Sequence, residues 1–449
     1  MTYYFETYGC QMNSAESAAL TLVCKERGWQ EAPNGESAGL VLLNTCSVRL
    51  TAEKRAFGRI AHYAALKKKR SEKKLKNSFT LVIAGCMAQR LGEKLKEKYR
   101  EVDYVMGTSS RSVFPMILEA AENGSKAVLD LNENPVFSFS KSHFEEGQFR
   151  SFVPIMHGCN NFCSYCIVPY VRGREVSRDP QSIAQEIRLV GERGVKEITI
   201  LGQNVNSYFW EKDKMDFSAL LSFASQEAVK SGLKWIRFLS ANPANFSSKT
   251  IEVMATDKIF CRHLHLPVQH GSNRILKAMN RGYTAQRFFD LVREIRAAMP
   301  GITLSTDILV GFPGETEDDL EQTLNLMEEV KFLYAYMYHF NPREGTKAFD
   351  LPDRIGEDVK RQRLSRVIAL QKKHTAQLLK SRIGSTEVVL VEGISRKNAD
   401  ELITRTEKDE MAAVPGHKSM IGSFAKLTLS SLKGNTFRAK EIIQCPGDL

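Results

Sequence analysis

Short apolar runs alternate with longer amphipathic segments over the first 106 residues of the chain. Apolar runs of this length are typical of buried β-strands, and the 3.6-residue periodicity between them is typical of helices. Such alternation predicts a parallel sheet with helices on both faces, which is a doubly wound α/β domain. The strands are expected at residues 2–8, 39–43, 79–84 and 103–106, and the helices at 14–27, 51–69 and 90–99.

The hydrophobic pattern lapses between residues 132 and 150, where Pro135 and Gly147 stand among polar residues, and then restarts. We interpret the lapse as a linker between a first domain, residues 1–131, and a second, residues 151–382. Six strand–helix steps in the second domain predict a partial (β/α)6 barrel, with its active site at the carboxyl ends of the strands. The strands are expected near 152–157, 197–201, 235–239, 263–266, 303–310 and 335–340, and the helices near 179–191, 217–230, 247–255, 284–298 and 316–330.

A long basic amphipathic helix, residues 357–382, is expected to end the second domain. Short apolar runs separated by turns follow in residues 383–449 and predict a small antiparallel β-barrel. Barrels of this kind often bind oligonucleotides. The strands of this third domain are expected at 387–392, 400–405, 411–414 and 423–430.

The chain has a net charge of +11 and a pI near 9.1, which favours a polyanionic partner. The basic run 67–76 and the helix 357–382 are candidate phosphate-contacting surfaces, although charge runs are more often simply solvated. No run is long enough to cross a bilayer and no signal peptide is visible, so we expect a cytoplasmic enzyme that acts at nucleic acid. We also expect no disulfides among its nine cysteines.

Three cysteines, Cys159, Cys163 and Cys166, lie in one short loop directly after the expected strand 152–157. Three thiolates on a four-iron cluster leave one iron open, and an open iron can chelate the amino and carboxylate groups of S-adenosylmethionine (SAM). Tyr165, the aromatic before the last cysteine, is placed to lie against the adenine. A zinc site completed by His157 is the alternative, and it is less favoured because structural zinc usually divides its ligands between two separated pairs.

Cys10, Cys46 and Cys86 each follow a predicted strand of the first domain. The carboxyl ends of parallel strands meet at one edge of the sheet, so these three thiols are expected to converge as a second cluster site. The alternative is that they are small core residues. That alternative is preferred for Cys24, which lies on an apolar helix face, while Cys445 is expected to be a surface thiol.

Polar residues follow the predicted strands of the second domain and are expected to line a pocket with hydrogen-bonding walls. Asp307 lies inside a strand, where a lone carboxylate is unfavourable unless it is paired, so it is expected to be functional or ion-paired. The residues single out no protein general base. The candidate cofactor-contacting residues at this rim are Gln203, Asn204, Ser240, Gln269 and Asp307, together with Tyr165 in the loop.

Over essentially its whole length the chain resembles the radical-SAM methylthiotransferases, which join a three-cysteine domain, a radical-SAM barrel and a C-terminal TRAM barrel. Its motifs are most similar to those of the tRNA branch, the MiaB type. The sequence departs from the pattern at His157, where arginine is common, at His270, where serine is common, and loosely after Ile383. The matching motifs are Gly9-Cys-Gln-Met-Asn13, Gly158-Cys-Asn-Asn-Phe-Cys-Ser-Tyr-Cys166, Gly202-Gln-Asn-Val-Asn206, His265-Leu-Pro-Val-Gln269, Met279-Asn-Arg-Gly-Tyr283 and Asp307-Ile-Leu-Val-Gly-Phe-Pro-Gly-Glu-Thr316.

The resemblance implies an enzyme that places a methylthio group on C2 of N6-isopentenyladenosine beside the tRNA anticodon. It implies two [4Fe-4S] clusters and two SAM molecules per turnover, with Gln203 and Asn204 contacting SAM. The barrel cluster would reduce SAM to give a 5′-deoxyadenosyl radical, the cluster on Cys10, Cys46 and Cys86 would hold the sulfur, and a second SAM would supply the methyl group. An external electron donor such as a flavodoxin, a monomeric state and no membrane association are further expectations.

Other functions share some of these features. The ribosomal-protein and threonylcarbamoyladenosine branches of the family have the same six cysteines, and the Gln-Met-Asn sequence after Cys10 favours the isopentenyladenosine branch over both. A non-catalytic iron–sulfur protein that binds RNA or carries electrons is also conceivable. A pure carrier gains nothing from open irons and would close them with a fourth thiolate, so we favour an enzyme.

Overall fold

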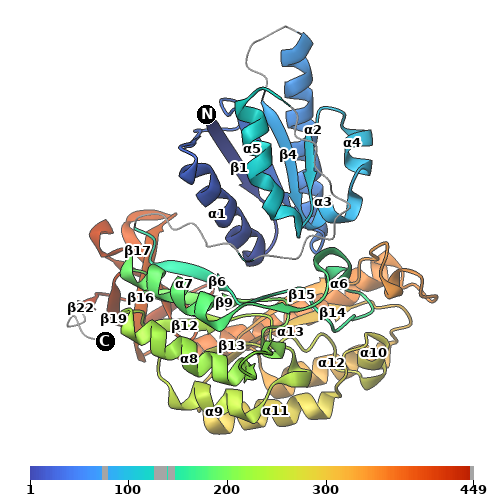
Figure 1. The fold of residues 1–449 in the computed structure, drawn as a ribbon. Helices are drawn as coiled ribbons and strands as arrows, with labels where there is room; N and C mark the ends of the chain where they lie inside the picture. Colours follow the sequence, from blue (N-terminus) through green and yellow to red (C-terminus); the bar gives the residue numbers. More distant parts are fainter. Residues whose placement is uncertain (73–78, 126–138, 140–146, 445–449) are drawn as a thin grey trace.

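The computed structural model describes residues 1–72, 79–125, 139 and 147–444. An N-terminal α/β domain lies beside a barrel of parallel strands, and a C-terminal β-domain packs at one end of that barrel (Figure 1). The expected linker, residues 132–150, falls mostly outside the described residues, as does Cys445. The domain boundaries inferred from the sequence therefore stay predictions.

The N-terminal domain contains a parallel sheet of five strands in the order β2-β1-β3-β4-β5. The chain changes direction across the sheet between β1 and β3, and in open α/β sheets the crevice beyond such a switch point is the usual place for a site. The strands are β1 Thr2–Thr7, β2 Gln30–Glu31, β3 Leu40–Thr45, β4 Thr80–Gly85 and β5 Tyr104–Met106.

Helices cover both faces of this sheet, which confirms the predicted doubly wound fold. Leu40 and Leu42 of β3 pack toward α1 and α5, whereas Val41 and Leu43 pack toward α2, α3 and α4. Both faces of β3 are thus buried, which explains its unbroken apolar run. Cys24 is on the buried face of α1, as expected. The helices are α1 Gln11–Glu26, α2 Leu50–Glu72, α3 Cys86–Leu91, α4 Lys94–Lys98 and α5 Phe114–Glu122.

Six parallel strands form the open barrel in the order β6-β9-β12-β13-β14-β15, which confirms the predicted partial barrel. A single bridge between Ile236 and Phe260 joins β12 to the segment before β13. Short pairs of strands, β7 with β8 and β10 with β11, lie outside this series. The strands are β6 Arg150–Pro154, β7 Met156–His157, β8 Val176–Ser177, β9 Glu197–Leu201, β10 Phe209–Trp210, β11 Met215–Asp216, β12 Trp235–Phe238, β13 His263–His265, β14 Thr303–Val310 and β15 Tyr334–His339.

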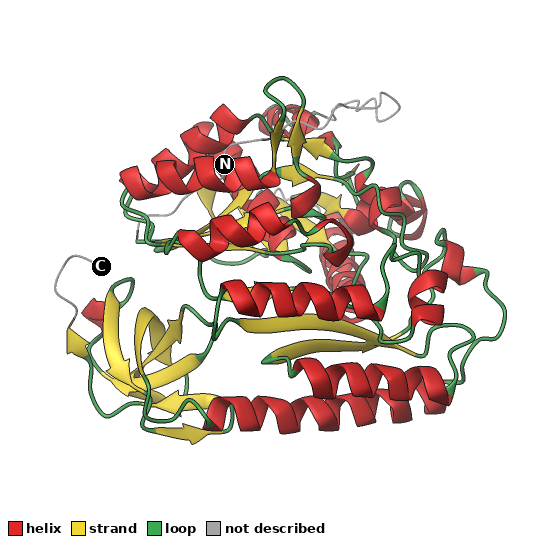
Figure 2. Ribbon diagram, turned by 90° about the horizontal axis from the view of Figure 1, so that it is seen from below, coloured by secondary structure: helices red, strands yellow, loops and turns green. Residues whose placement is uncertain are grey.

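Helices pack on the outer face of the barrel strands through one large apolar cluster (Figure 2). Thr316 caps α12 with the expected oxygen-bearing side chain and forms a capping box with Asp319. The α-helices of this domain are α6 Val168–Arg172, α7 Pro180–Glu192, α8 Phe217–Lys230, α9 Ser248–Thr256, α10 Asn273–Ala278, α11 Ala285–Ala298, α12 Glu317–Val330 and α13 Glu357–Lys380.

The C-terminal domain is a seven-stranded sheet in the order β20-β21-β18-β17-β16-β19-β22. Its strands pair antiparallel except for β18 with β21, so the predicted antiparallel β-domain is largely confirmed and has more strands than expected. The strands are β16 Thr386–Ser395, β17 Asn398–Thr406, β18 Met411–Pro415, β19 Phe424–Thr428, β20 Ser431–Lys433, β21 Thr436–Arg438 and β22 Ile443–Gln444.

The turn between β17 and β18, residues 406–410, closes the amino-terminal end of the barrel. Arg237 inside the barrel donates hydrogen bonds of 2.9 and 3.0 Å to two backbone carbonyls of this turn. Thr303 donates one of 2.9 Å to a third carbonyl, and Arg405 pairs with the buried Glu197 at 2.7 Å. The C-terminal domain is therefore a structural part of the barrel as well as a neighbour of it.

Two expectations from the sequence are wrong in detail. The helix expected at 90–99 is two short helices, α3 and α4, because Gly92 between them adopts a φ of +51° that interrupts the helix. The strand expected at 152–157 is broken into β6 and β7 at Ile155, where β7 leaves the barrel to pair with β8. Several basic side chains of α13 pair with carboxylates, including those of Arg363, Arg366 and Lys373, and the contact of this helix with RNA phosphates stays a prediction.

Candidate functional site

The loop that carries Cys159, Cys163 and Cys166 follows β7 at the carboxyl end of the barrel. The Asn280 amide donates hydrogen bonds of 3.2 and 3.1 Å to two carbonyls of the loop, those of Asn161 and Phe162. The peptide N–H of Cys166 donates to the Cys163 carbonyl at 3.0 Å, so these two cysteines share one turn, while the N–H of Cys159 donates to the Gly173 carbonyl at 3.1 Å. The loop is thus shaped by its own backbone and by the segment after α10.

Hydrogen-bond donors point at the sulfurs of this loop. The guanidinium of Arg281 lies 3.3 Å from the Cys163 sulfur, and the Asn161 amide lies 3.6 Å from the Cys159 sulfur. Burial raises the pKa of the Cys166 thiol to about 12. A thiol this weakly acidic becomes a thiolate at neutral pH only when a metal replaces its proton, and donors aimed at the sulfur then stabilise the negative charge. The donor set therefore fits an iron–sulfur cluster.

A zinc site completed by His157 would need its ligands grouped around one ion. Within the part of the chain that the structure describes, no three His, Cys, Asp or Glu side chains lie close enough together to hold one metal ion. A four-iron cluster is wider than a single ion, so its three thiolates stand further apart. His157, the proposed fourth zinc ligand, is buried on β7.

Cys10, Cys46 and Cys86 lie at the carboxyl ends of β1, β3 and β4, the edge predicted from the sequence. Cys10 precedes α1 and Cys86 is the first residue of α3. Gly9 has a φ of +114°, and a side chain there would bring its Cβ within 2.5 Å of the Cys46 Cβ, so glycine is required for this close approach. The peptide N–H of Val48 donates to the Cys46 sulfur at 3.3 Å. Strand ends distant in sequence thus converge, and the ligand assignment itself stays a prediction.

Asn13, the last residue of the Gly9-Cys-Gln-Met-Asn13 motif, joins the loops of this triad. Its amide donates to the carbonyl of Tyr8 at 2.8 Å and to that of Thr45 at 3.0 Å, which fixes the ends of β1 and β3 relative to each other. Its carbonyl oxygen accepts from Arg172 of the barrel domain at 2.9 Å and lies 3.7 Å from the Cys10 sulfur. Asn13 therefore has a structural role that explains the motif.

The two triads occupy facing edges of their domains. Cys86 packs against Ile167 and Val171, which lie directly after the barrel loop. Arg172, at the end of α6, forms an almost fully buried ion pair of 2.7 Å with Glu16 on α1. A buried ion pair of this kind holds two surfaces in one geometry, because separating the charges inside protein is costly. The carboxyl ends of the N-terminal sheet and of the barrel therefore meet.

The predicted cofactor-contacting residues lie at the barrel rim. Gln203 accepts a hydrogen bond of 2.6 Å from the peptide N–H of Gly158, beside the cysteine loop. The Asn204 amide donates to Glu175 at 3.1 Å, while its own carbonyl oxygen is buried without a hydrogen-bond partner among the described residues. A buried polar atom without a partner is unusual and fits a site that a polar ligand completes.

Ser240 and Gln269 have left-handed backbone conformations, with φ of +65° and +70°. Non-glycine residues in this region are strained, and such strain concentrates at functional sites. Asp307 lies 3.4 Å from the His265 ring nitrogen, so the carboxylate has a polar neighbour, and its role at the site stays a prediction. Tyr165 packs in an apolar cluster with Met279 and its neighbours in the fold, and its contact with an adenine stays a prediction.

The sequence motifs contain two buried arginines beside the triads that reasoning from the sequence did not single out. Arg281 lies within Met279-Asn-Arg-Gly-Tyr283, and Arg172 within the Arg-Gly-Arg run after the cysteine loop. Each is buried beside one triad. Burial of an arginine cannot be inferred from a lone basic residue in a sequence, because most arginines are exposed.

Three family models match the chain, and together they span the three parts of the fold. The Radical SAM superfamily matches residues 153–327, Uncharacterized protein family UPF0004 matches residues 2–107, and the TRAM domain matches residues 380–440. Among solved structures, the radical S-adenosylmethionine methyltransferase TsrM from Kitasatospora setae is similar with a TM-score of 0.58 and 16% identity, over 78% of this chain and 74% of that one. This likeness supports the fold alone. Fold, triads and models define a radical-SAM protein with a TRAM domain.

Curated relatives identify the family within this class. A tRNA-2-methylthio-N(6)-dimethylallyladenosine synthase from Treponema denticola is 47% identical and covers 98% of this chain and 99% of its own. An enzyme of the same name from Carboxydothermus hydrogenoformans is 39% identical, and the match covers 98% of this chain and 99% of that one. The chain belongs to the tRNA-2-methylthio-N(6)-dimethylallyladenosine synthase family of radical-SAM methylthiotransferases.

Proposed function

We propose that the protein adds a methylthio group to C2 of N6-isopentenyladenosine beside the anticodon of tRNA. The observation that carries the proposal is the meeting of two three-cysteine sets at facing edges of two domains, in a chain 47% identical to an enzyme of that name. One set alone would suffice for a radical-SAM site. A second set beside the same rim suits a reaction that needs a sulfur source close to the substrate.

Cys159, Cys163 and Cys166 would hold one [4Fe-4S] cluster, and Cys10, Cys46 and Cys86 a second. When bound, the clusters and SAM supply the electron, the sulfur and the methyl group that the reaction needs. The protein supplies position and charge compensation. Arg281 and Arg172 place a positive charge beside each triad. Gln203 and Asn204 would orient SAM at the rim, where the buried Asn204 side-chain oxygen could accept a hydrogen bond from it.

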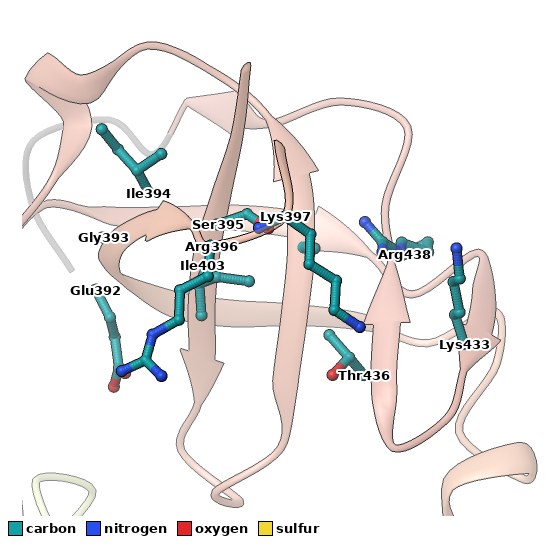
Figure 3. A pocket seen from close by; sticks show the side chains of 11 residues that line it. Glu392, Gly393, Ile394, Ser395, Arg396, Lys397, Ile403, Lys433, Thr436 and Arg438 are labelled. Atoms are coloured by element: carbon teal, nitrogen blue, oxygen red, sulfur yellow. The ribbon is translucent and has the colours of Figure 1, made fainter. Parts of the chain in front are cut away.

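The TRAM domain would hold the tRNA through its phosphates. A hollow of about 430 Å³ on this domain is lined by basic side chains, with Arg396 and Lys397 on one side and Lys433 and Arg438 on the other (Figure 3). Basic side chains around a shallow hollow suit an RNA backbone, because each phosphate that they bind releases counterions. This surface would therefore bind the tRNA.

Three finer expectations complete the proposal. An external one-electron donor of the flavodoxin type would reduce the barrel cluster, the chain would act as a monomer, and its location would be the cytoplasm, where tRNA is modified. None of the helices in the described residues is both long and apolar enough to cross a membrane.

The decisive test is nucleoside analysis of bulk tRNA from cells that lack this protein. We expect methylthio-isopentenyladenosine to disappear and unmodified isopentenyladenosine to accumulate, with threonylcarbamoyladenosine products unchanged. Restoring the gene should restore the modified nucleoside. Loss of a methylthio mark on a ribosomal protein, or on threonylcarbamoyladenosine, with the isopentenyladenosine mark intact would overturn the proposal in favour of another branch.

A point variant tests the RNA surface more sharply than removal of residues 383–449. Such a deletion should weaken tRNA binding and flatten its salt dependence, yet it also removes the 406–410 turn that closes the barrel. We therefore expect a chain with Arg396, Lys397 and Lys433 changed to Gln to have a shallower log–log salt slope, by about one unit for each phosphate that it no longer binds. Binding of tRNA across a salt series measures this slope.

The matched control replaces three exposed basic residues on the outer side of the barrel with Gln: Lys249 on α9, Lys258 in the turn after it and Arg287 on α11. It makes the same change in net charge away from the hollow. An identical loss of slope in both variants would mean that net charge, and not this hollow, holds the tRNA.

A further inference from the structure

Strand β15 presents tyrosines to one side only. It pairs with β14, and within the described residues it has no second partner strand, so it forms an open edge of the barrel. Ala335 and Met337 pack on the apolar cluster beneath the outer helices. Because side chains alternate along a strand, Tyr334, Tyr336 and Tyr338 point to the opposite, inner face.

The two tyrosines nearer the carboxyl end are open to solvent. Tyr336 is 53% exposed and Tyr338 40% exposed. Tyr334 is less exposed and lies near Asp409 of the turn that closes the barrel. The inner face is thus closed at the amino end and open toward the rim. Single exposed aromatic side chains are ordinary, whereas adjacent ones on the same face of a strand form a patch that suits a bound ligand.

Neighbouring side chains fix the ring of Tyr336. The His265 ring meets it nearly edge-on, with centroids 5.6 Å apart and an interplanar angle of 74°. His265 is held in turn by Ser305 at 3.1 Å and by Asp307 at 3.4 Å. A ring held in place loses little entropy when a partner stacks on it.

A basic residue from the other domain reaches the same place. Arg343, shortly after β15, donates to the carbonyl of Val48 at 3.2 Å, which brings Arg49, three residues after Cys46, close to Tyr338. Arg49 is itself exposed. The two rings therefore lie between the barrel rim and the loop of the second triad, with a cation beside them.

We propose that Tyr336 and Tyr338 form a stacking platform for the adenine base that is modified, with Arg49 contacting an adjacent phosphate. The inference deepens the proposed function and rests on it. Single-stranded RNA loops are bound by stacking of unpaired bases on aromatic side chains, and a nearby arginine pairs with the backbone. The platform lies on the inner face of the last barrel strand, beside the loop that follows Cys46 of the second triad.

The test compares three double variants of the full-length protein: Tyr336→Ala with Tyr338→Ala, both to Leu, and both to Phe. Each is titrated with an anticodon stem-loop RNA that carries 2-aminopurine at the target position. Stacking quenches this fluorescent base, so the readout is independent of turnover. We expect the Ala pair to bind about 10- to 100-fold more weakly and to leave the base unquenched. The Phe pair should stay within about threefold of wild type, and the Leu pair should resemble the Ala pair.

Circular dichroism and thermal melting serve as the folding control, and all three variants should melt as the wild type does. Unchanged affinity and quenching in the Ala pair would overturn the platform. So would an equal loss in the Phe pair, because the hydroxyls and not the rings would then be responsible. If wild-type protein fails to bind this RNA and binds a ribosomal-protein peptide instead, the proposed function itself fails, which is a different outcome.

Discussion

The two cysteine triads differ in how the chain assembles them. Cys159, Cys163 and Cys166 lie within one loop of eight residues, whose shape depends largely on local hydrogen bonds. Cys10, Cys46 and Cys86 come from three separate strand ends and meet only when the parallel sheet forms. The first site is therefore encoded in a motif, and the second is encoded in a topology. A sequence search for short metal-binding motifs finds the first and misses the second.

Their buried arginines differ as well. Arg281 donates to the Cys163 sulfur at 3.3 Å and otherwise bonds the neutral groups of Tyr283 and Pro267, so its charge is directed at the triad. Arg172 divides its hydrogen bonds between Glu16 and Asn13 across the domain junction. We infer that Arg281 acts on the chemistry of its triad, whereas Arg172 holds the second triad against the barrel.

The largest effect should come from breaking one triad at a time. Cys163→Ala removes a thiolate from the barrel site, so we expect neither 5′-deoxyadenosine nor methylthio product. Cys86→Ala disturbs only the site in the other domain, so SAM cleavage with a reductant should persist while methylthio product falls below detection. Quantifying both products for both variants by mass spectrometry separates the two roles.

Iron content is the control for that comparison. Anaerobically prepared wild-type protein should hold about eight irons as two four-iron clusters, and each variant about four. A Cys24→Ala variant should keep all of them, since that thiol is on the buried face of α1. If folded Cys86→Ala protein keeps the barrel cluster and no longer cleaves SAM, the proposed division of labour is wrong.

The placement of both triads and of the rim residues could be predicted from the sequence. Apolar runs of five or six residues separated by helical periodicity determine a parallel sheet, and the sheet then brings Cys10, Cys46 and Cys86 to one edge. The rim residues Gln203, Asn204, Ser240 and Gln269 follow from the same rule in the barrel. Strand order and strand ends are thus enough to place candidate residues without any side-chain detail.

The remaining features depend on tertiary contacts that no local pattern encodes. The basic residues of α13 form the same pattern whether they face RNA or the carboxylates of α12, and only packing decides between these. The closure of the barrel by residues 406–410 joins segments about 170 residues apart in sequence. The division of the helix expected at 90–99 depends on the φ angle of one residue, Gly92, and no sequence pattern specifies that angle.

The Arg172–Glu16 pair should have the next largest effect. Arg172→Met leaves a buried carboxylate without its guanidinium, which typically destabilises a protein by about 3–5 kcal/mol. We expect the N-terminal domain to unfold at lower urea concentration and the second triad to lose iron first. The matched variant Arg172→Met with Glu16→Leu removes both charges and should recover most of the stability. Equal destabilisation by both would mean that packing, and not charge, holds the junction.

The smallest effect, and the sharpest test of the contrast, concerns Arg281. Its guanidinium lies 3.3 Å from the Cys163 sulfur, so it favours the more negative, reduced form of a cluster bound there. A hydrogen bond to a charged group contributes about 1.5–3 kcal/mol, which for one electron corresponds to roughly 60–130 mV. We expect Arg281→Met to lower the reduction potential of the barrel cluster by an amount of this order, in a redox titration followed by electron paramagnetic resonance. Arg281→Lys keeps the charge and loses the planar fork, so it should shift the potential less. The cluster of the other triad should keep its potential in both variants, since Arg281 belongs to the barrel site alone. A shift of equal size at both clusters would show that the arginine acts through the fold and not through the Cys163 sulfur, and the two arginines would then not differ in role.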